Sequence, residues 1–266
     1  MLTTHDSRLT AKYAVSAVSY INTKPFLHGL ELSSVRNKIL LTQETPAQCA
    51  QKLLSNEIDI GLVPVAVIPL LKNPQIVSPF CIGSNGVVKT VCLFSEVPLE
   101  EINTIYLDYQ SRTSVLLVQL LMKEYWKKEV VFLPALEGYE NNTIKNNIAA
   151  VIIGDRAIAN LGKYSYEYDL SEAWKQYTGL PFVFAAWVSN KIIDQGFLDD
   201  FNAALQIGLS NRNQLLPEYE SYNSAVFSVK EYWNTNIQYE LDTDMKQALE
   251  LFLKKLNPKQ QFFYCY

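Results

Sequence analysis

The feature that most constrains the fold of this chain is the alternation of short, β-rich apolar runs with segments of helical spacing. We expect strands at residues 13–20, 38–42, 58–63, 87–94, 104–107, 130–133, 149–153 and 182–189. We expect helical segments at residues 46–55, 65–71, 113–126, 171–179, 197–209, 230–233 and 242–256. Strands and helices that alternate along most of a chain are typical of the α/β class.

Two of the expected helices carry end signals. Thr45 can cap a helix that begins with Pro46, and Gln48 stands where a capping box needs an amide. Ser171 can cap a second helix, and Gly179 suits its left-handed end. Ligands of open α/β sheets bind beyond the carboxyl ends of the strands, so the segments that follow strands are the first candidates for a site.

Two long strands divide the chain. The runs at 87–94 and 182–189 each join a set of strand–helix units to a differently organised neighbour. We therefore expect two lobes, the first formed by residues 12–92 and 188–266 and the second by residues 95–183. Because pockets favour domain interfaces, the ligand is expected in the cleft between the lobes.

Charge and hydropathy narrow the classes of function. The 266 residues include 23 Lys and Arg against 27 Asp and Glu, which gives a net charge of -4 at pH 7. Such a chain has no summed positive field to hold a nucleic acid or an anionic membrane surface. It also lacks the roughly 18 consecutive apolar residues of a membrane span and the pattern of an export signal. We expect a cytoplasmic protein that binds neither nucleic acid nor membrane.

Common catalytic motifs are missing from the sequence. No GxGxxG, GxxxxGK[ST], GxSxG or HExxH motif occurs, and the four cysteines form no Cys-x-x-Cys pair. The two histidines are His5, near the N-terminus, and His28, just after the first polar turn. No cluster of metal-ligating residues supports a metal site. A reaction in this protein is therefore expected to depend on binding and polarisation rather than on a metal or a nucleophile.

The first polar segment follows the first expected strand. Ser19, Tyr20, Asn22 and Thr23 stand there, just before a proline. Asn and Thr are ordinary turn residues, which is one interpretation of the segment. The other is that the Asn22 amide and nearby backbone N–H groups point into the cleft and bind a ligand oxygen.

The second polar segment leads into the first dividing strand. Gly86 allows another group to approach the backbone closely, and Thr90 lies on the strand that joins the two lobes. A simple turn before an interior strand, with Thr90 present as a β-former, explains the same residues. The position of Thr90 between the lobes favours a ligand site.

A third polar segment follows a strand of the expected second lobe. Ser111, Arg112, Thr113 and Ser114 combine hydroxyl donors, one guanidinium and the start of a helix, which suits a carboxylate. Helix capping by Ser111 or Thr113 needs no ligand, and the two roles can coexist.

Two smaller candidates complete the set. Gly154 and Asp155 repeat the arrangement after the strand at 149–153, where a helix cap explains Asp155 better than an acid catalyst. The aromatic-rich stretch 174–187 is expected to be mostly core, with Phe184 as a candidate wall of the pocket.

Together these motifs resemble the chorismate dehydratases of the futalosine route to menaquinone. The resemblance spans nearly the whole chain and rests on six stretches in order: VSYINTKP (18–25), IDIGLVPVA (58–66), SNGVVKTV (84–91), LDYQSRTSVLL (107–117), IIGD (152–155) and WKQYTGLPFVFAAW (174–187). It implies a two-lobe fold like that of type II periplasmic binding proteins, a cytoplasmic location, and catalysis without cofactor or metal.

The resemblance also implies roles for individual residues. The key asparagine of the family corresponds to Asn22, and its pocket hydroxyl corresponds to Thr90, where relatives often carry serine. The ligand-binding segment of the second lobe corresponds to residues 111–114. The implied reaction removes water from chorismate, a dianion, to give 3-[(1-carboxyvinyl)oxy]benzoate. In this hypothesis Asn22 holds the departing C4 hydroxyl, the other donors hold carboxylates, and the enolpyruvyl carboxylate of the substrate takes the C3 proton.

Three alternatives stay open. A non-catalytic protein of the same fold that binds a small carboxylate would need an export signal. The dihydroxynaphthoate synthase of the same pathway relies on a histidine and an SPCPND-like start, where this chain has VSYINTKP. A ligand-sensing domain like those of LysR-type regulators would carry an appended DNA-binding helix-turn-helix. The sequence does not give the oligomeric state.

Overall fold

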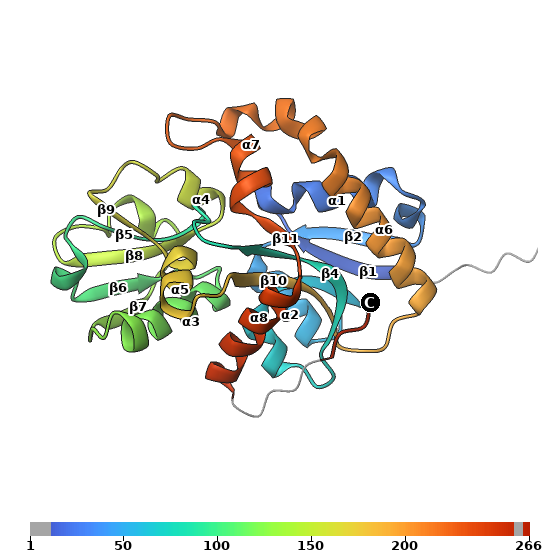
Figure 1. The fold of residues 1–266 in the computed structure, drawn as a ribbon, viewed down its shortest axis with the longest axis horizontal. Coiled ribbons are helices and arrows are strands. Elements are labelled where there is room, and N and C mark those ends of the chain that lie inside the picture. Colours follow the sequence, from blue (N-terminus) through green and yellow to red (C-terminus); the bar gives the residue numbers. More distant parts are fainter. Residues whose placement is uncertain (1–11, 258–262) are drawn as a thin grey trace, which may run out of the picture.

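Two β-sheets, each with helices packed on its faces, make up the protein. The computed structural model describes residues 12–257 and 263–266. The order of strands is β11-β4-β10-β3-β1-β2 in the first sheet and β7-β6-β8-β5-β9 in the second. Figure 1 shows the two sheets side by side along the long axis of the molecule. The α/β class predicted from the sequence is confirmed.

The two sheets draw on different parts of the chain. The strands of the first sheet come from both ends of it: β1 (Tyr13–Val18), β2 (Ile39–Glu44), β3 (Ile60–Pro64), β4 (Gln75–Ser84), β10 (Phe182–Ser189) and β11 (Gln238–Glu240). The strands of the second sheet come from one continuous stretch: β5 (Val91–Ser95), β6 (Thr104–Leu107), β7 (Val131–Pro134), β8 (Ile148–Ile153) and β9 (Tyr166–Asp169).

Each sheet contains an interior strand that runs against both of its neighbours. In the first sheet β10 is antiparallel to β3 and to β4, and in the second sheet β5 is antiparallel to β8 and to β9. The chain passes from the first sheet into the second through β5, and it returns to the first sheet through β10. The chain crosses between the sheets at residues 85–90 and again at residues 179–181.

The crossings differ in part from the prediction. The strand expected at 87–94 begins only at Val91, because Gly86 and Lys89 adopt positive φ angles of 128° and 64° that a regular strand does not accommodate. The strand expected at 182–189 has the predicted bounds and lies wholly in the first sheet. The division into lobes at 12–92, 188–266 and 95–183 stays a prediction.

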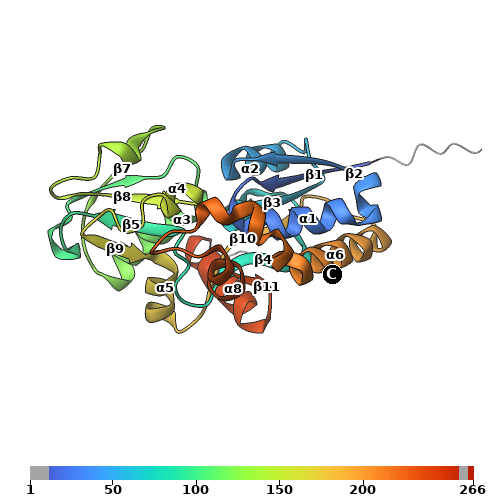
Figure 2. The same ribbon diagram turned by 90° about the horizontal axis from the view of Figure 1, so that it is seen from above.

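Helices cover both sheets. Those on the side of the first sheet are α1 (Lys24–Leu32), α2 (Pro46–Leu54), α6 (Gln195–Asn211), α7 (Val229–Glu231) and α8 (Thr243–Leu256), and those on the side of the second are α3 (Arg112–Leu120), α4 (Asp155–Ile158) and α5 (Leu170–Thr178). Figure 2 shows α1 and α6 side by side. Their backbones touch at Gly29 and Gly208, where an added Cβ would lie about 2 Å from a carbonyl oxygen of the facing helix. None of the helices in the described residues is long and apolar enough to cross a membrane.

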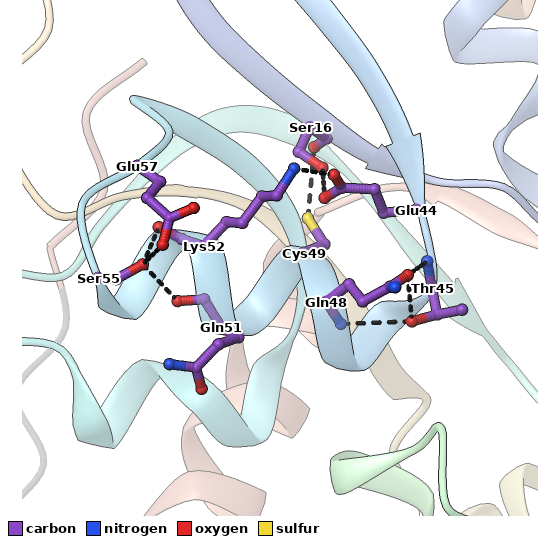
Figure 3. A network of polar contacts seen from close by, with 9 residues as sticks. All are labelled: Ser16, Glu44, Thr45, Gln48, Cys49, Gln51, Lys52, Ser55 and Glu57. Atoms are coloured by element: carbon purple, nitrogen blue, oxygen red, sulfur yellow. Dashed lines mark hydrogen bonds and ion pairs between the residues drawn. The ribbon is translucent and has the colours of Figure 1, made fainter.

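The ends of α2 and α5 agree in part with the signals predicted from the sequence. The capping box of α2 is confirmed: Thr45 Oγ1 accepts from the Gln48 N–H, and the Gln48 side chain bonds the Thr45 N–H (Figure 3). Gly179 ends α5 at a φ of 76°, as predicted. The expected cap of α5 is wrong, because the Asp169 carboxylate caps this helix by accepting from two N–H groups, one of them that of Ser171. An ionised carboxylate is a stronger acceptor than a serine hydroxyl.

The aromatic stretch before and within β10 is core, as predicted. Trp174, Phe182 and Trp187 are at most 1% exposed. The Trp187 ring packs edge-on against Phe201 at 5.1 Å between centroids, and Trp174 packs in the same way against Phe182 at 5.3 Å. This packing fixes β10 in the middle of the first sheet.

Candidate functional site

A small cavity lies between the two sheets, at the carboxyl ends of their strands. Val18, Pro64 and Ile153, the last residues of β1, β3 and β8, lie in its wall. Its volume is about 60 Å³, several times the roughly 10–15 Å³ that one water needs on the same measure. The position agrees with the rule that α/β sheets bind ligands beyond their carboxyl strand ends.

The predicted site residues fall into two groups. Those that line the cavity are Tyr20, Asn22, Thr90, Ser111, Thr113, Ser114, Gly154 and Phe184. Those that do not line it are Ser19, Thr23, Gly86, Arg112 and Asp155. Residues from four separate polar segments and from β10 therefore meet in one place. In the second group, Ser19, Thr23, Gly86 and Asp155 have other structural roles, and Arg112 lies on a different surface.

Asn22 lies in the 3₁₀ turn Ile21–Thr23 that follows β1, and it is 9% exposed. Its side-chain oxygen accepts from the Thr23 hydroxyl at 3.2 Å, and its backbone carbonyl accepts from the Tyr239 hydroxyl at 2.9 Å. Thr23 is fully buried, so its hydroxyl orients Asn22 instead of facing the cavity. Ser19 is exposed, and its N–H continues the pairing of β1 with β2 by donating to the carbonyl of Glu44.

Thr90 stands at the end of the first crossing and is 2% exposed. Its hydroxyl lies 2.8 Å from the Tyr232 hydroxyl, and its carbonyl accepts from the Gly154 N–H at 2.9 Å. Gly86 lies earlier in the crossing, where its carbonyl accepts from the Ser84 hydroxyl at 3.2 Å. Gly86 therefore shapes the turn that delivers Thr90, and it does not approach the cavity.

The crossing is anchored to the second sheet by Asp169. One carboxylate oxygen accepts from the N–H groups of Val88 and Lys89, at 2.9 and 2.7 Å, while the other caps α5. Burial raises the pKa of Asp169 to about 6, against the opposing effect of these N–H groups. This carboxylate fixes the backbone directly before Thr90.

The segment Ser111–Ser114 opens α3. Ser111 lines the cavity and also caps the helix, since its hydroxyl accepts from the Ser114 N–H at 3.0 Å, so both predicted roles are compatible. The Thr113 hydroxyl accepts from the Ala66 N–H at 3.2 Å and joins α3 to the side of the first sheet. Arg112 does not line the cavity. It lines a neighbouring hollow of about 780 Å³, to which Ser111 also contributes.

Tyr20 covers the cavity from the side of the first sheet. Its hydroxyl donates to the side-chain oxygen of Gln110 at 2.5 Å, and its ring lies against Gly154, where an added Cβ would be 2.8 Å from the ring carbons. Burial, together with the nearby carboxylate of Asp108, raises the pKa of Tyr20. The phenol is therefore neutral and serves as a hydrogen-bond donor.

Asp155 connects the two sides beside the cavity. The prediction that it caps a helix is wrong. Gly154 occupies the cap position of α4 at a φ of 62°. The Asp155 carboxylate instead accepts from the Ile21 N–H and from the Tyr222 hydroxyl, both at 3.1 Å. Burial raises the pKa of Asp155, and these two donors oppose the shift.

The walls of the cavity carry no formal charge. Its polar groups are hydroxyls, one carboxamide and the start of α3, whose free N–H groups and dipole favour an anion. Within the described part of the chain no group of three or more His, Cys, Asp or Glu residues is arranged to hold a metal ion. His28 is half-buried within α1 and does not line the cavity, and His5 lies outside the described residues.

Sequence reasoning missed several groups that surround the cavity. They reach it through tertiary contacts, and all but Gln110, which precedes the polar segment 111–114, belong to segments with no local functional signal: Gln110, Asp169, Tyr222, Tyr232 and Tyr239. The one sequence signal for any of these groups is the pair of adjacent aromatic residues at 232–233. The same pattern is equally typical of a helix packed in the core.

The paired sheets, the two crossings and the cavity between them define a protein of the periplasmic-binding-protein fold. The alkanesulfonate-binding protein SsuA of Xanthomonas axonopodis pv. citri, bound to MOPS, has a TM-score of 0.66 at 14% identity, over 96% of this chain and 99% of that one. A Candida albicans protein described as having the generic periplasmic binding protein fold has a TM-score of 0.57 at 14% identity, over 96% and 97%. A protein of Archaeoglobus fulgidus has a TM-score of 0.72 at 13% identity, over 93% and 97%.

The family follows from sequence comparison. The model of the menaquinone biosynthesis family matches residues 13–258, and this chain belongs to that family. The chain is also 26% identical over 281 aligned positions to the chorismate dehydratase of Thermus thermophilus, which covers 95% of this chain and 98% of that protein.

Proposed function

We propose that the protein is a chorismate dehydratase, a hydro-lyase that converts chorismate to 3-[(1-carboxyvinyl)oxy]benzoate and water. Family membership and the similarity to the Thermus thermophilus enzyme support this activity. The observation that carries the proposal is that Asn22 and Thr90 line one cavity with Ser111 and Ser114, although they come from three different segments of the chain.

The reaction needs little chemical equipment from the protein. The C3–H and C4–O bonds of chorismate break, the proton and the hydroxide leave as water, and the ring becomes aromatic without any oxidant. In our proposal the Asn22 carboxamide holds the departing C4 hydroxyl, and the enolpyruvyl carboxylate of the substrate takes the C3 proton. The site contributes fixed donors at the positions where charge develops, which is commonly the largest catalytic effect.

The carboxylates of the substrate would be held by dipoles. The start of α3, with the Ser111 and Ser114 hydroxyls, suits one carboxylate, and the Thr90 hydroxyl suits the other. Such binding fits a protein whose net charge is -4, because it needs a local arrangement of donors and no positive field.

The cavity is smaller than typical ligand pockets of roughly 300–1,000 Å³. We therefore infer that the two sides separate to admit chorismate and close again around it. The contacts that must open include those of Tyr20 with Gln110, of Asp155 with Ile21 and of Thr113 with Ala66. Closure would exclude water and align the C–O bond with its donors.

Incubation of the purified protein with chorismate tests the proposal. We expect chorismate to disappear and an aromatic absorbance to rise, with a product lighter than chorismate by one water in mass spectrometry. A sample without protein corrects for spontaneous rearrangement of chorismate. Tight binding of chorismate without any turnover would instead support a non-catalytic binding protein of the same fold.

A further inference from the structure

Side chains near the C-terminus lie directly behind the turn that carries Asn22. Trp233 Nε1 donates to the carbonyl of Ile21 at 3.0 Å, and the Tyr239 hydroxyl donates to the carbonyl of Asn22 at 2.9 Å. Both donors are buried, so these bonds are sheltered from water. Figure 1 shows the chain between α7 and β11 passing between the two sides of the molecule.

The same stretch, residues 232–239, also holds the crossing that carries Thr90. Asn236 Nδ2 donates to the carbonyl of Val87 at 3.1 Å, and the Tyr232 hydroxyl lies 2.8 Å from Thr90 Oγ1. One continuous stretch therefore bonds to the two separate segments that bring Asn22 and Thr90 to the cavity. Its geometry determines how far apart those two side chains stand.

Tyr232 has the central place in this stretch. It is 0% exposed and does not line the cavity, so it lies one layer behind the groups that would contact a ligand. A threonine hydroxyl can rotate to several partners, and the bond to Tyr232 selects one orientation. Burial raises the pKa of Tyr232, although the side chains of Thr90 and Asn22 counteract part of the shift. The phenol is therefore protonated at neutral pH and acts as a hydrogen-bonding partner, not as a base.

The backbone around Tyr232 is unusual as well. Tyr232 begins the π-helical turn Tyr232–Asn236, which follows directly after α7. Single π-helical turns are rare and occur frequently at functional sites. In this turn the side chains of Tyr232, Trp233 and Asn236 all find partners on the two site segments.

We propose that Tyr232 is a positioning residue for the dehydration of chorismate, which acts by fixing the Thr90 hydroxyl against Asn22. This role rests on the proposed function. It assigns to residues 232–239 a part in building the site, in addition to their place in the core of the protein.

Kinetics of Tyr232→Phe test the proposal, because the ring is kept and only the hydroxyl is lost. We expect kcat to fall about 10-fold or more, as for a misplaced catalytic group, while KM changes less than about twofold. Thr90→Val should lower kcat as well. In the double variant kcat should match that of Thr90→Val within about twofold, because the tyrosine acts through the threonine.

Tyr164→Phe is the matched control. Its hydroxyl also makes one hydrogen bond, which it donates to the backbone carbonyl of Glu140 at 3.0 Å instead of to a residue of the site. Tyr164 does not line the cavity, so this variant should keep the wild-type kcat. Thermal unfolding of all variants separates a loss of stability from a loss of positioning.

Three outcomes would overturn the proposal. Wild-type kcat in Tyr232→Phe would remove the positioning role and leave the proposed function intact. Losses that multiply in the double variant would show that Tyr232 does not act through Thr90. A wild-type protein that leaves chorismate unchanged would contradict the proposed function, and the positioning role would fall with it.

Discussion

The carboxylate of Asp155 accepts a hydrogen bond from the backbone N–H of Ile21 at 3.1 Å, and so ties the start of α4 to the turn that carries Asn22. The second carboxylate oxygen accepts from the Tyr222 hydroxyl on the same side of the molecule as Ile21. A single side chain therefore makes two bonds across the line along which the site must open. If closure is part of binding, the strength of these bonds determines how readily the closed state forms.

Asp155→Ala tests this contact. The loss of two buried bonds should weaken the closed state by about 1–3 kcal/mol, which raises KM for chorismate about 5- to 150-fold and lowers the melting temperature. Asp199→Ala, on the exposed face of α6, is the control and should change neither quantity. A wild-type KM in Asp155→Ala would show that the contact plays no part in closure.

Asn22→Ala tests the proposed leaving-group donor. Removal of one preorganised donor typically costs about 10²-fold in kcat, and we expect a loss of that size. Binding of the product, which lacks the C4 hydroxyl, should weaken less than about threefold in calorimetric titration. Asn103→Ala, at an exposed position before β6, is the matched control. An unchanged kcat in Asn22→Ala would remove Asn22 from the mechanism.

Gly154→Ala compared with Gly179→Ala separates backbone strain from damage to the site. Both glycines have positive φ, 62° and 76°, but Gly179 is left-handed helical, while the ψ of -146° places Gly154 near a region open almost only to glycine. Alanine therefore costs about 1 kcal/mol of strain at Gly179 and about 1–3 kcal/mol at Gly154. An added Cβ meets the Tyr20 ring at 2.8 Å at Gly154 and meets nothing within 4 Å at Gly179. We expect both variants to melt at a lower temperature, and only Gly154→Ala to lose activity. Equal activity in the two variants would contradict the close packing of Tyr20 on Gly154.

The titration of Asp169 predicts a pH dependence of stability. Because burial raises its pKa to about 6 from the ordinary 3.8, the folded protein holds this proton more tightly than the unfolded chain does. The resulting stabilisation is complete below about pH 4 and is lost as the pH rises through about 6. Asp169→Asn cannot titrate, so the wild type should lose up to about 3 kcal/mol relative to this variant between pH 4 and pH 7.

Urea unfolding of both proteins at several pH values measures that difference. The missing acceptor oxygen in Asp169→Asn shifts its stability by an amount that does not depend on pH, so the slope alone carries the test. A difference that stays constant, or that grows as the pH rises, would contradict a raised pKa.

Local signals predicted much of the fold. The bounds of β10 and β6, the capping box at Thr45 and the left-handed end at Gly179 were all predicted, because each depends on neighbouring residues. β4 was missed. It contains Pro79 and Gly83, which weaken any strand pattern, and its pairing with β10 and β11 on either side compensates for them.

The candidate site was predictable where its residues lie next to strand ends. Asn22 follows β1 and Thr90 directly precedes β5, and the two share a cavity. The backbone geometry at the start of α3 decides whether Ser111 or Arg112 faces that cavity. Residue types alone do not reveal this geometry. The contacts of Asp155 and Tyr232 join segments far apart in the chain, so they depend on the assembled fold.

The continuous chain order of the second sheet and the interrupted order of the first have a consequence for how the protein is made. The strands of the second sheet, from Val91 to Asp169, leave the ribosome in one uninterrupted stretch. β3 and β4 emerge earlier but remain apart until β10 arrives to fill the place between them. A nascent chain can therefore complete the second sheet first, while the first sheet waits with open edges for a strand encoded more than a hundred codons downstream of β3.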